Sequence, residues 1–427
     1  MHIRLKERSA GVLIGGDMNA ASKVLMIITL DTKAAEARYV RGVLEEQGVA
    51  VVHLDASIRA TVSGGAEIGP EAVAEAAGST LEEVRALKHE GKCQAVMTQG
   101  AMKLAEDLHR RGEISGVIGV GGSMGTTLAT AVMRALPYGL PKLMISTMAS
   151  GFTRPFVGNR DILMLNSVCD IAGLNTITRE VFRNGAIAVA AMAREFKSAT
   201  ADDRPLVMLS TLSTTDKCSV RVREALTRKG YEVMVFHTLG TGGMTMDDIV
   251  RERDVAAVVD LSLVEINDFL QGGLCSAGPD RSKAALEKGV PTIFAPGNID
   301  FMVAGPIDQA KAQFPGKRYH MHNAALTAVR AEAKELKALA DHMAGLIGEA
   351  KGPVAFFVPL KGFSAHDSPQ GYLHDPTLPP VFAEHLKRVM PVDVPVTVLD
   401  CHINDEPFAD AVIQWVLEWT QPPRQAV

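Results

Sequence analysis

The sequence predicts an α/β protein made of two Rossmann-like subdomains, each with a mainly parallel sheet and flanking helices. Short aliphatic runs alternate along the chain with stretches of helical periodicity, and such runs are typical of strands buried on both faces of a parallel sheet. Hydrophobic residues form 47% of the chain but aromatic residues only 5%, so the expected core is aliphatic. Because 427 residues exceed the size of one ordinary core, we expect more than one domain.

The first subdomain is predicted over residues 23–198, after an N-terminal extension at residues 1–22 that lacks a clear pattern. Its first strand is the apolar run at residues 23–30, which three polar residues interrupt: Asp31, Thr32 and Lys33. In parallel sheets, ligands bind at the carboxyl ends of strands, so these three residues are candidates for cofactor binding. The following elements are expected as a helix at 34–47, a strand at 49–54, a helix opened by a Ser79–Glu82 capping box, a strand at 94–98, a helix at 101–111, strands at 143–147 and 161–165, and a helix at 178–196.

The most informative stretch is a glycine-rich turn within residues 117–127, where a strand of β-branched residues leads into an apolar helix. Glycines let backbone amides approach a ligand closely, and hydroxyl side chains add donors at the positive end of the helix dipole. This arrangement suits a phosphate or carboxylate, although a turn that only packs the helix on the sheet is the alternative. Met124 replaces the third glycine of the dinucleotide pattern, and no Lys completes a Walker loop. The candidate cofactor-binding residues here are Gly119, Gly121, Gly122, Ser123, Gly125, Thr126 and Thr127.

The pattern restarts after a polar linker at residues 199–204 and predicts a second subdomain over residues 205–427. Three residues of the first half recur 182 positions later in the second half, namely Arg41, Leu44 and Gly48 as Arg223, Leu226 and Gly230. This repetition favours two α/β domains of similar origin. Its elements are expected as strands at 205–212, 231–236, 255–262, 291–295, 354–358 and 394–399, and helices at 217–229, 282–288, 324–347 and 407–419.

Polar residues in the second half gather where the predicted strands end, which is where a second substrate site would form. The candidate catalytic residues are Glu265, Arg281, His322 and Lys361. Arg281 and Lys361 could receive the carboxylate of a small acidic metabolite.

A metal site is an alternative use of the same region. His320 and His322 lie two residues apart, so both side chains share a face of an extended segment. A divalent metal could bind this pair, with a third ligand from His402, Asp260 or Asp300.

Composition argues against several other classes of protein. The net charge is −5 and no basic block interleaves with aromatic residues, so a nucleic-acid partner is not expected. The five cysteines are scattered, which favours a reducing cytoplasm over a disulfide framework. Neither a signal peptide nor an apolar stretch long enough to cross a membrane is found, and no Gly-x-Ser-x-Gly elbow indicates a nucleophile.

The glycine-rich turn, residues 159–170 and 276–281, His322-Asn323, and the closing His402-Ile-Asn-Asp405 together carry a resemblance to a known family. The chain resembles an uncharacterised protein family of bacteria, fungi and plants, which also supplies the ATP-binding N-terminal domain of the tomato mosaic virus resistance protein. The resemblance implies two α/β subdomains, a homodimer, and binding of ATP, for which Mg²⁺ is a candidate cofactor. In these terms the phosphates would lie on the glycine-rich turn, Thr127 or Asp31 would help to hold Mg²⁺, and Lys33 would offset phosphate charge.

Three functions therefore stand as expectations. The first is a cytoplasmic ATP-binding enzyme that acts on a small acidic metabolite. The second is a module in which ATP stabilises a protein-binding conformation, since the plant domain inhibits a viral replication protein. The third is a metal-dependent hydrolase that uses His320 and His322.

Overall fold

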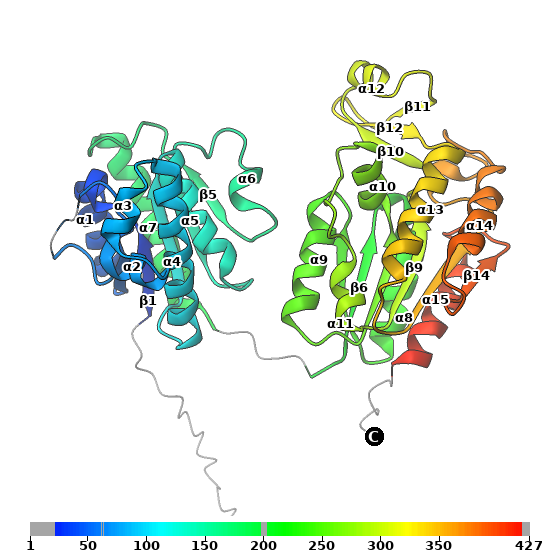
Figure 1. The fold of residues 1–427 in the computed structure, drawn as a ribbon, viewed down its shortest axis with the longest axis horizontal. Coiled ribbons are helices and arrows are strands. Elements are labelled where there is room, and N and C mark those ends of the chain that lie inside the picture. The colour runs from blue at the N-terminus through cyan, green and yellow to red at the C-terminus, as the bar shows by residue number, and fades with distance from the viewer. Residues whose placement is uncertain (1–21, 61, 63, 198–202, 421–427) are drawn as a thin grey trace, which may run out of the picture. The chain divides into compact units, whose positions relative to one another are not determined.

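The computed structural model describes residues 22–60, 62, 64–197 and 203–420. The chain divides between residues 199 and 200 into two compact units, called here the N-terminal and C-terminal domains. Each is described separately (Figure 1). Residues 1–21 of the predicted extension and most of the predicted linker lie outside the described residues.

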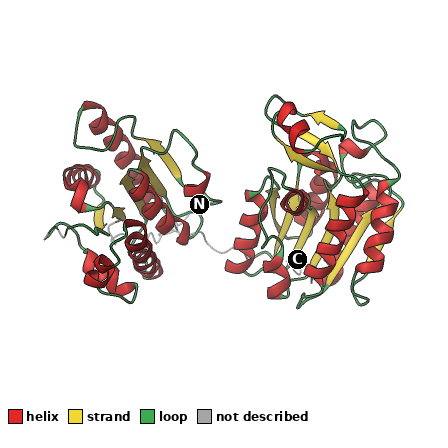
Figure 2. Cartoon of the chain, turned by 45° about the horizontal axis from the view of Figure 1, so that its top comes forward, coloured by secondary structure: helices red, strands yellow, loops and turns green. Residues whose placement is uncertain are grey.

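The N-terminal domain is a five-stranded parallel sheet in the order β2-β1-β3-β4-β5, with helices on both faces (Figure 2). Alternate residues of β1 point to opposite faces: Leu25 and Ile27 pack beneath α2–α5, whereas Val24 and Met26 pack beneath α1 and α7. Both faces of the strand are therefore buried, which accounts for its continuous apolar run. The strands are β1 (Lys23–Ile27), β2 (Ala50–Leu54), β3 (Gly116–Gly121), β4 (Lys142–Ser146) and β5 (Leu163–Asn166). The helices are α1 (Leu30–Glu46), α2 (Pro70–Ala76), α3 (Leu81–Ala86), α4 (Glu90–Arg110), α5 (Ser123–Ala135), α6 (Arg154–Val157) and α7 (Thr176–Glu195).

Two local predictions for this domain are wrong. Residues 94–98 belong to α4 rather than to a strand, because Met97, Ala101, Ala105 and Leu108 form one buried face with helical spacing. A five-residue window was too short to distinguish the two periods. The capping box begins one residue later than predicted, with Thr80 as N-cap and Glu83 as its partner.

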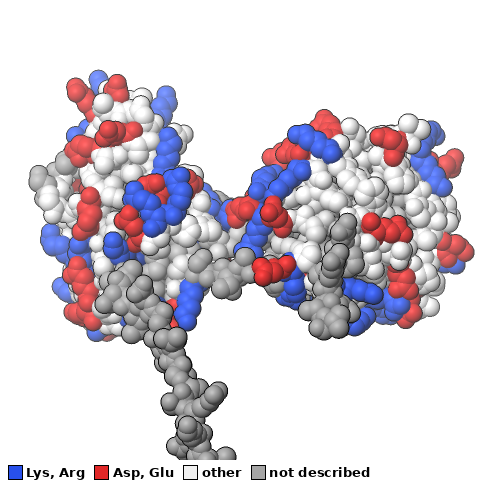
Figure 3. All heavy atoms as spheres, turned by 90° about the horizontal axis from the view of Figure 1, so that it is seen from below, with Lys and Arg blue, Asp and Glu red and all other residues white. Residues whose placement is uncertain are grey.

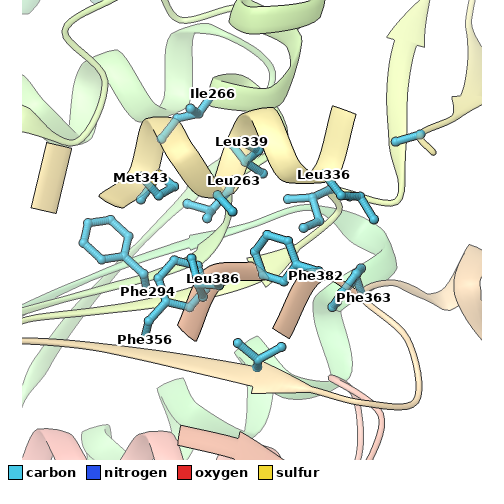
Figure 4. Close-up of a cluster of buried hydrophobic side chains, with 14 of the residues drawn as sticks. Leu263, Ile266, Phe294, Leu336, Leu339, Met343, Phe356, Phe363, Phe382 and Leu386 are labelled. Atoms are coloured by element: carbon cyan, nitrogen blue, oxygen red, sulfur yellow. The ribbon is translucent and has the colours of Figure 1, made fainter. Parts of the chain in front are cut away.

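The C-terminal domain has a six-stranded parallel sheet in the order β7-β6-β8-β9-β13-β14. Helices α8 and α15 cover one face. On the other face, α10, α13 and α14 enclose the largest apolar cluster, in which Phe294 and Phe356 of the sheet meet Leu339 and Phe382 (Figure 4). The sheet strands are β6 (Leu206–Thr211), β7 (Glu232–His237), β8 (Ala257–Ser262), β9 (Thr292–Gly297), β13 (Val354–Pro359) and β14 (Val396–Leu399). The α-helices are α8 (Asp216–Arg228), α9 (Thr241–Glu252), α10 (Val264–Gln271), α11 (Lys283–Lys288), α12 (Ile307–Gln313), α13 (Ala333–Ile347), α14 (Leu378–Val389) and α15 (Glu406–Trp419). Two short 3₁₀ helices are η1 (Ser213–Thr215) and η2 (Ala365–Asp367).

A small antiparallel sheet, β10-β12-β11, interrupts the second domain between β9 and α13. Its strands are β10 (Phe301–Ala304), β11 (Tyr319–Met321) and β12 (Thr327–Arg330). The single helix predicted over residues 324–347 is therefore wrong in its first third. Every residue of β12 is buried and pairs with β10, and Arg330 forms an ion pair with Asp367 at 3.0 Å. Such long-range partners override local helical spacing.

The two domains share one topology. If the strands of each domain are numbered in chain order, both sheets run 2-1-3-4-5, and the second adds a sixth strand. The repeated residues occupy matching places, since Gly48 and Gly230 both follow the first helix with positive φ, 73° and 87°. The predicted architecture of two Rossmann-like subdomains is confirmed.

The surface carries charges of both signs. On the face seen in Figure 3, basic and acidic side chains are interspersed over both domains. Among the described residues, no helix is both long enough and apolar enough to cross a membrane.

Candidate functional site

A cavity of about 240 Å³ lies at the carboxyl ends of β1 and β3 in the N-terminal domain. The two strands are neighbours in the sheet, but the chain leaves β1 toward β2 on one side and leaves β3 toward β4 on the other. Such a point is the topological switch point at which ligands bind in open α/β sheets. The cavity, called here the glycine-turn cavity, is lined by Thr29, Asp31, Thr32, Lys33, Ala56, Ile58, Arg59, Glu90, Gln94, Gly122, Ser123, Met124, Gly125 and Leu128.

The glycine turn, residues 121–125, brings the start of α5 to this cavity. Gly122 is the N-cap of α5, and no side chain caps this helix end. The first amides of a helix have no acceptor within the helix, so they and the positive end of the dipole are available to an anion. A Cβ at Gly121 would lie only 2.8 Å from Gly125 Cα, so this close approach of the backbone requires glycine. At Gly122 the nearest atom to a Cβ would be Thr147 Oγ1 at 3.8 Å, an ordinary van der Waals contact, so a Cβ fits there.

The predicted residues of the turn separate into two groups. Gly122, Ser123 and Gly125 line the cavity. Gly119 instead lies within β3, where a Cβ would approach the Ala129 Cβ of α5 to 2.6 Å, so this glycine allows the helix to pack closely.

Two of the three predicted hydroxyls have partners inside the protein. Thr126 is buried and its Oγ1 lies 2.6 Å from Ser146 Oγ. Thr127 Oγ1 donates to the Ser123 carbonyl at 2.9 Å. Ser123 is therefore the hydroxyl residue of the turn that lines the cavity.

The residues after β1 form the first turn of α1 rather than a loop. Asp31, Thr32 and Lys33 all line the cavity. Lys33 has non-helical backbone angles, φ −135° and ψ 34°, and its Nζ donates to the Ile171 carbonyl at 2.7 Å. The Asp31 carboxylate accepts the Arg59 amide at 3.0 Å and so holds the loop after β2 at the cavity.

Of the lining residues that the sequence analysis did not predict, three have charged or amide side chains: Arg59, Glu90 and Gln94. Arg59 Nη2 lies 2.6 Å from Glu90 Oε1, and Gln94 Nε2 donates to the Met124 carbonyl at 2.5 Å. Glu90 and Gln94 are one helical turn apart in α4, so correct assignment of that helix would have placed both on one face. Arg59 lies in the loop after β2, which ends at Leu54, and its place in a loop that follows a strand was the available signal.

In the C-terminal domain, buried side chains that bind one another occupy the corresponding carboxyl ends of the strands. Arg281 lies between two carboxylates, with Nη1 2.7 Å from Asp260 Oδ2 and Nε 2.8 Å from Glu265 Oε2, and all three side chains are at most 1% exposed. Burial alone would lower the pKa of Arg281, but Asp260 and Glu265 outweigh it and raise that pKa. Arg281 and Glu265 are thus paired in the interior, where a substrate carboxylate does not reach them.

Glu265 also fills a helix end. Its Oε1 accepts the amides of Gly240 and Gly243, at 2.7 and 3.1 Å, at the start of α9. Of the other predicted catalytic residues, Lys361 pairs with Asp400 at 3.2 Å on the surface, and His322 is exposed beyond β11.

The predicted metal ligands do not converge. His320 stacks on Tyr372, with ring centroids 4.3 Å apart, and its ring centroid lies 4.8 Å from that of His366. His402 instead contacts the Ser364 carbonyl through Nε2 at 2.9 Å. Within the described ranges, no three His, Cys, Asp or Glu side chains are placed to hold a metal ion. Burial, together with His320 and His322, lowers the pKa of His366 to about 4.

Comparison with known proteins assigns the family. The N-terminal and C-terminal domain profiles of one family match residues 22–198 and 204–420. The chain belongs to the uncharacterised protein family UPF0261. The predicted resemblance is thereby confirmed.

Three UPF0261-related sequences illustrate the relationship. A UPF0261 protein of Clostridium tetani is 35% identical over 91% of this chain and 97% of its own length. A UPF0261 protein of Mesorhizobium japonicum is 33% identical over 91% of this chain and 97% of its own length. The ToMV resistance protein Tm-1(GCR237) of Solanum lycopersicum is 32% identical over 77% of this chain, which corresponds to 44% of the tomato protein.

Proposed function

We propose that the N-terminal domain binds ATP in the glycine-turn cavity, with the phosphates on the amino end of α5. The observation that carries this proposal is an uncapped helix end that opens into a cavity at the switch point of the sheet. Gly122, Ser123 and Gly125 would surround the phosphates. Ala56, Ile58 and Leu128 supply apolar surface in the same cavity, which suits a nucleobase.

Mg²⁺ fits this site through oxygen ligands. The Asp31 carboxylate lines the cavity, and carboxylate oxygens together with phosphates are the usual ligands of Mg²⁺. Thr127 was the other candidate, but its hydroxyl donates within α5 and the residue is absent from the cavity lining. Asp31 is therefore the residue that we propose to hold the ion, which would neutralise phosphate charge.

The proposal assigns nucleotide binding and leaves the second substrate as a prediction. Glu265 and Arg281 are not part of it, since each is buried and paired with the other. The homodimer, the acidic metabolite, and the roles of His322 and Lys361 stay predictions.

Calorimetric titration of ATP into the full-length protein, with and without Mg²⁺, tests the proposal. We expect ATP to bind more tightly with Mg²⁺, and Asp31→Asn to remove most of that difference. Adenosine should bind much more weakly, because it lacks the phosphates. Absence of ATP binding in both conditions would reject the proposal, and phosphorus NMR of the same samples would report any hydrolysis.

A further inference from the structure

The glycine-turn cavity contains an ion pair between Arg59 and Glu90. The guanidinium Nη2 lies 2.6 Å from the Glu90 Oε1, and both residues line the cavity with Gly122 and Ser123. The two side chains are 64% and 50% exposed. Solvent therefore screens the pair, and separating its members costs little free energy.

The two partners differ in how they are held. Glu90 is the first residue of α4, one turn before Gln94, whose side chain binds the Met124 carbonyl in the glycine turn. Its carboxylate is thus attached to a helix that is fixed against the turn. Arg59 lies in the loop after β2, where its amide donates to Asp31 Oδ2 and fixes the backbone at the cavity. Its long side chain can rotate about that fixed point.

The charged side chains of the cavity indicate which basic side chain a phosphate would bind. Its lining carries two acids, Asp31 and Glu90, and two bases, Lys33 and Arg59, so the wall has no excess positive charge. Lys33 Nζ is already bonded to the Ile171 carbonyl at 2.7 Å. Arg59 instead faces an exposed carboxylate, which a phosphate can replace. The planar guanidinium matches phosphate oxygens in the same two-pronged geometry as a carboxylate.

We propose that Arg59 exchanges partners when nucleotide binds: its guanidinium leaves Glu90 and binds the terminal phosphate group. This inference rests on the proposed function of the cavity. Glu90 is then an internal competitor of the phosphate for the same guanidinium. The consequence is that the two members of one ion pair affect nucleotide affinity in opposite directions.

Titration calorimetry of the full-length variants tests the exchange, with ATP, inorganic triphosphate and adenosine as probes. Arg59→Ala should weaken ATP and inorganic triphosphate about tenfold or more, because a charge-assisted contact is lost. Its affinity for adenosine should stay within about twofold of the wild type, since the base does not use the contact. Glu90→Gln should instead strengthen both phosphate ligands by about two- to fivefold, as the competing ion pair is weak.

A second exposed ion pair on the same helix provides the matched control. Arg110 pairs with Asp107 at 2.7 Å near the far end of α4. Arg110→Ala and Asp107→Asn make the same changes in charge and should leave ATP affinity unchanged.

The outcomes separate this inference from the proposed function. If the wild type binds neither ATP nor inorganic triphosphate, both are rejected. If ATP binds and Gly122→Asp abolishes binding while Arg59→Ala does not alter it, the exchange alone is rejected. A Glu90→Gln variant that weakens ATP or leaves its affinity unchanged would also contradict the exchange.

Discussion

The third strand of each domain leads into a helix at the same point of the same topology, and neither helix has a side-chain cap, yet the surroundings of the two turns differ. In the N-terminal domain, β3 ends in glycines and α5 begins without a side-chain cap beside a cavity. In the C-terminal domain, β8 leads to α10, whose Glu265 is buried and binds both Arg281 and the first amides of α9. The start of α5 faces a cavity, whereas the first turn of α10 carries a buried carboxylate that is already bound to Arg281 and to the start of α9.

The surrounding groups extend this contrast. Asn298 at the end of β9 accepts the Ser262 hydroxyl at 2.7 Å, and Ser262 in turn contacts Thr238 at 2.8 Å. These bonds join the ends of neighbouring strands within the protein. The comparison teaches that a Rossmann-like topology provides the location of a site, while the residues at the strand ends decide whether that location binds a ligand or stabilises the fold.

The largest expected effect is on stability, from Arg281→Ala. Removal of the guanidinium leaves Asp260 and Glu265 as unpaired buried charges, which should lower the free energy of unfolding of the C-terminal domain by about 3–5 kcal/mol. Both tryptophans, Trp415 and Trp419, lie in α15, so urea unfolding followed by tryptophan fluorescence reports on this domain.

The control for that experiment is an exposed arginine of the same domain. Arg221 pairs with Asp410 at 2.8 Å on the surface, and Arg221→Ala should lower the stability far less than Arg281→Ala does, because solvent screens the pair. Equal losses for the two variants would contradict the structural role of Arg281. ATP affinity of the N-terminal domain should be the same in both.

An intermediate effect on stability is expected from Asp300→Asn, because the C-terminal domain buries the carboxyl groups of Asp300 and Asp367 next to each other. Burial and the nearby Asp367 raise the pKa of Asp300 from 3.8 to about 7. The folded state therefore holds the proton more tightly than the unfolded state, and the resulting stabilisation is present below about pH 4 and lost as pH rises toward 7. Asn cannot titrate, but it can still accept the Ser364 hydroxyl.

Relative to the wild type, Asp300→Asn should thus gain stability on the order of 1–3 kcal/mol between pH 4.5 and pH 8. Urea unfolding at several pH values measures this difference. The raised pKa values of Asp247 and Asp268 act in both proteins, so the difference reports on Asp300 together with Asp367, whose charge interacts with it. A difference that is constant with pH would show that the Asp300 carboxyl does not titrate in this range.

The smallest expected effect is on the stability of the open turn itself. Gly122→Asp should stabilise α5 by about 0.5 kcal/mol, because aspartate is a better N-cap than glycine and its charge favours the helix dipole. The backbone of Gly122, φ −75° and ψ −159°, is compatible with an aspartate N-cap. Hydrogen exchange of the α5 amides should slow or stay the same. Faster exchange would indicate that the turn does not accommodate the side chain.

Much of this arrangement was predictable where the signal was local. The strand runs, the glycine turn, and Asp31, Thr32 and Lys33 were found because apolar runs and glycines mark strand ends directly. Glu90 and Gln94 were missed because Gln94 was assigned to a strand and Glu90 to no element, which hid their common helical face.

The C-terminal region was less predictable because its contacts join distant parts of the chain. Arg281 and Glu265 were predicted to gather where strands end, but their sequence positions do not reveal that they bind each other. Strand β12 was likewise not predicted, because its residues have helical spacing and only the pairing with β10 makes them a strand. Local periodicity indicates an element, whereas ion pairing and burial depend on the assembled domain.

The most direct test of the account is calorimetric titration of ATP into the wild type, Gly122→Ala and Gly122→Asp. Gly122→Ala adds a Cβ at an ordinary contact distance from Thr147 and should change affinity little, which separates the effect of the added charge from that of the added atom. Gly122→Asp gives the first domain a carboxylate of its own at a helix end, as Glu265 does at the start of α9 in the second. We expect it to weaken ATP binding more than about tenfold while the domain stays folded. ATP affinity equal to that of the wild type would show that the open end of α5 does not hold the phosphates.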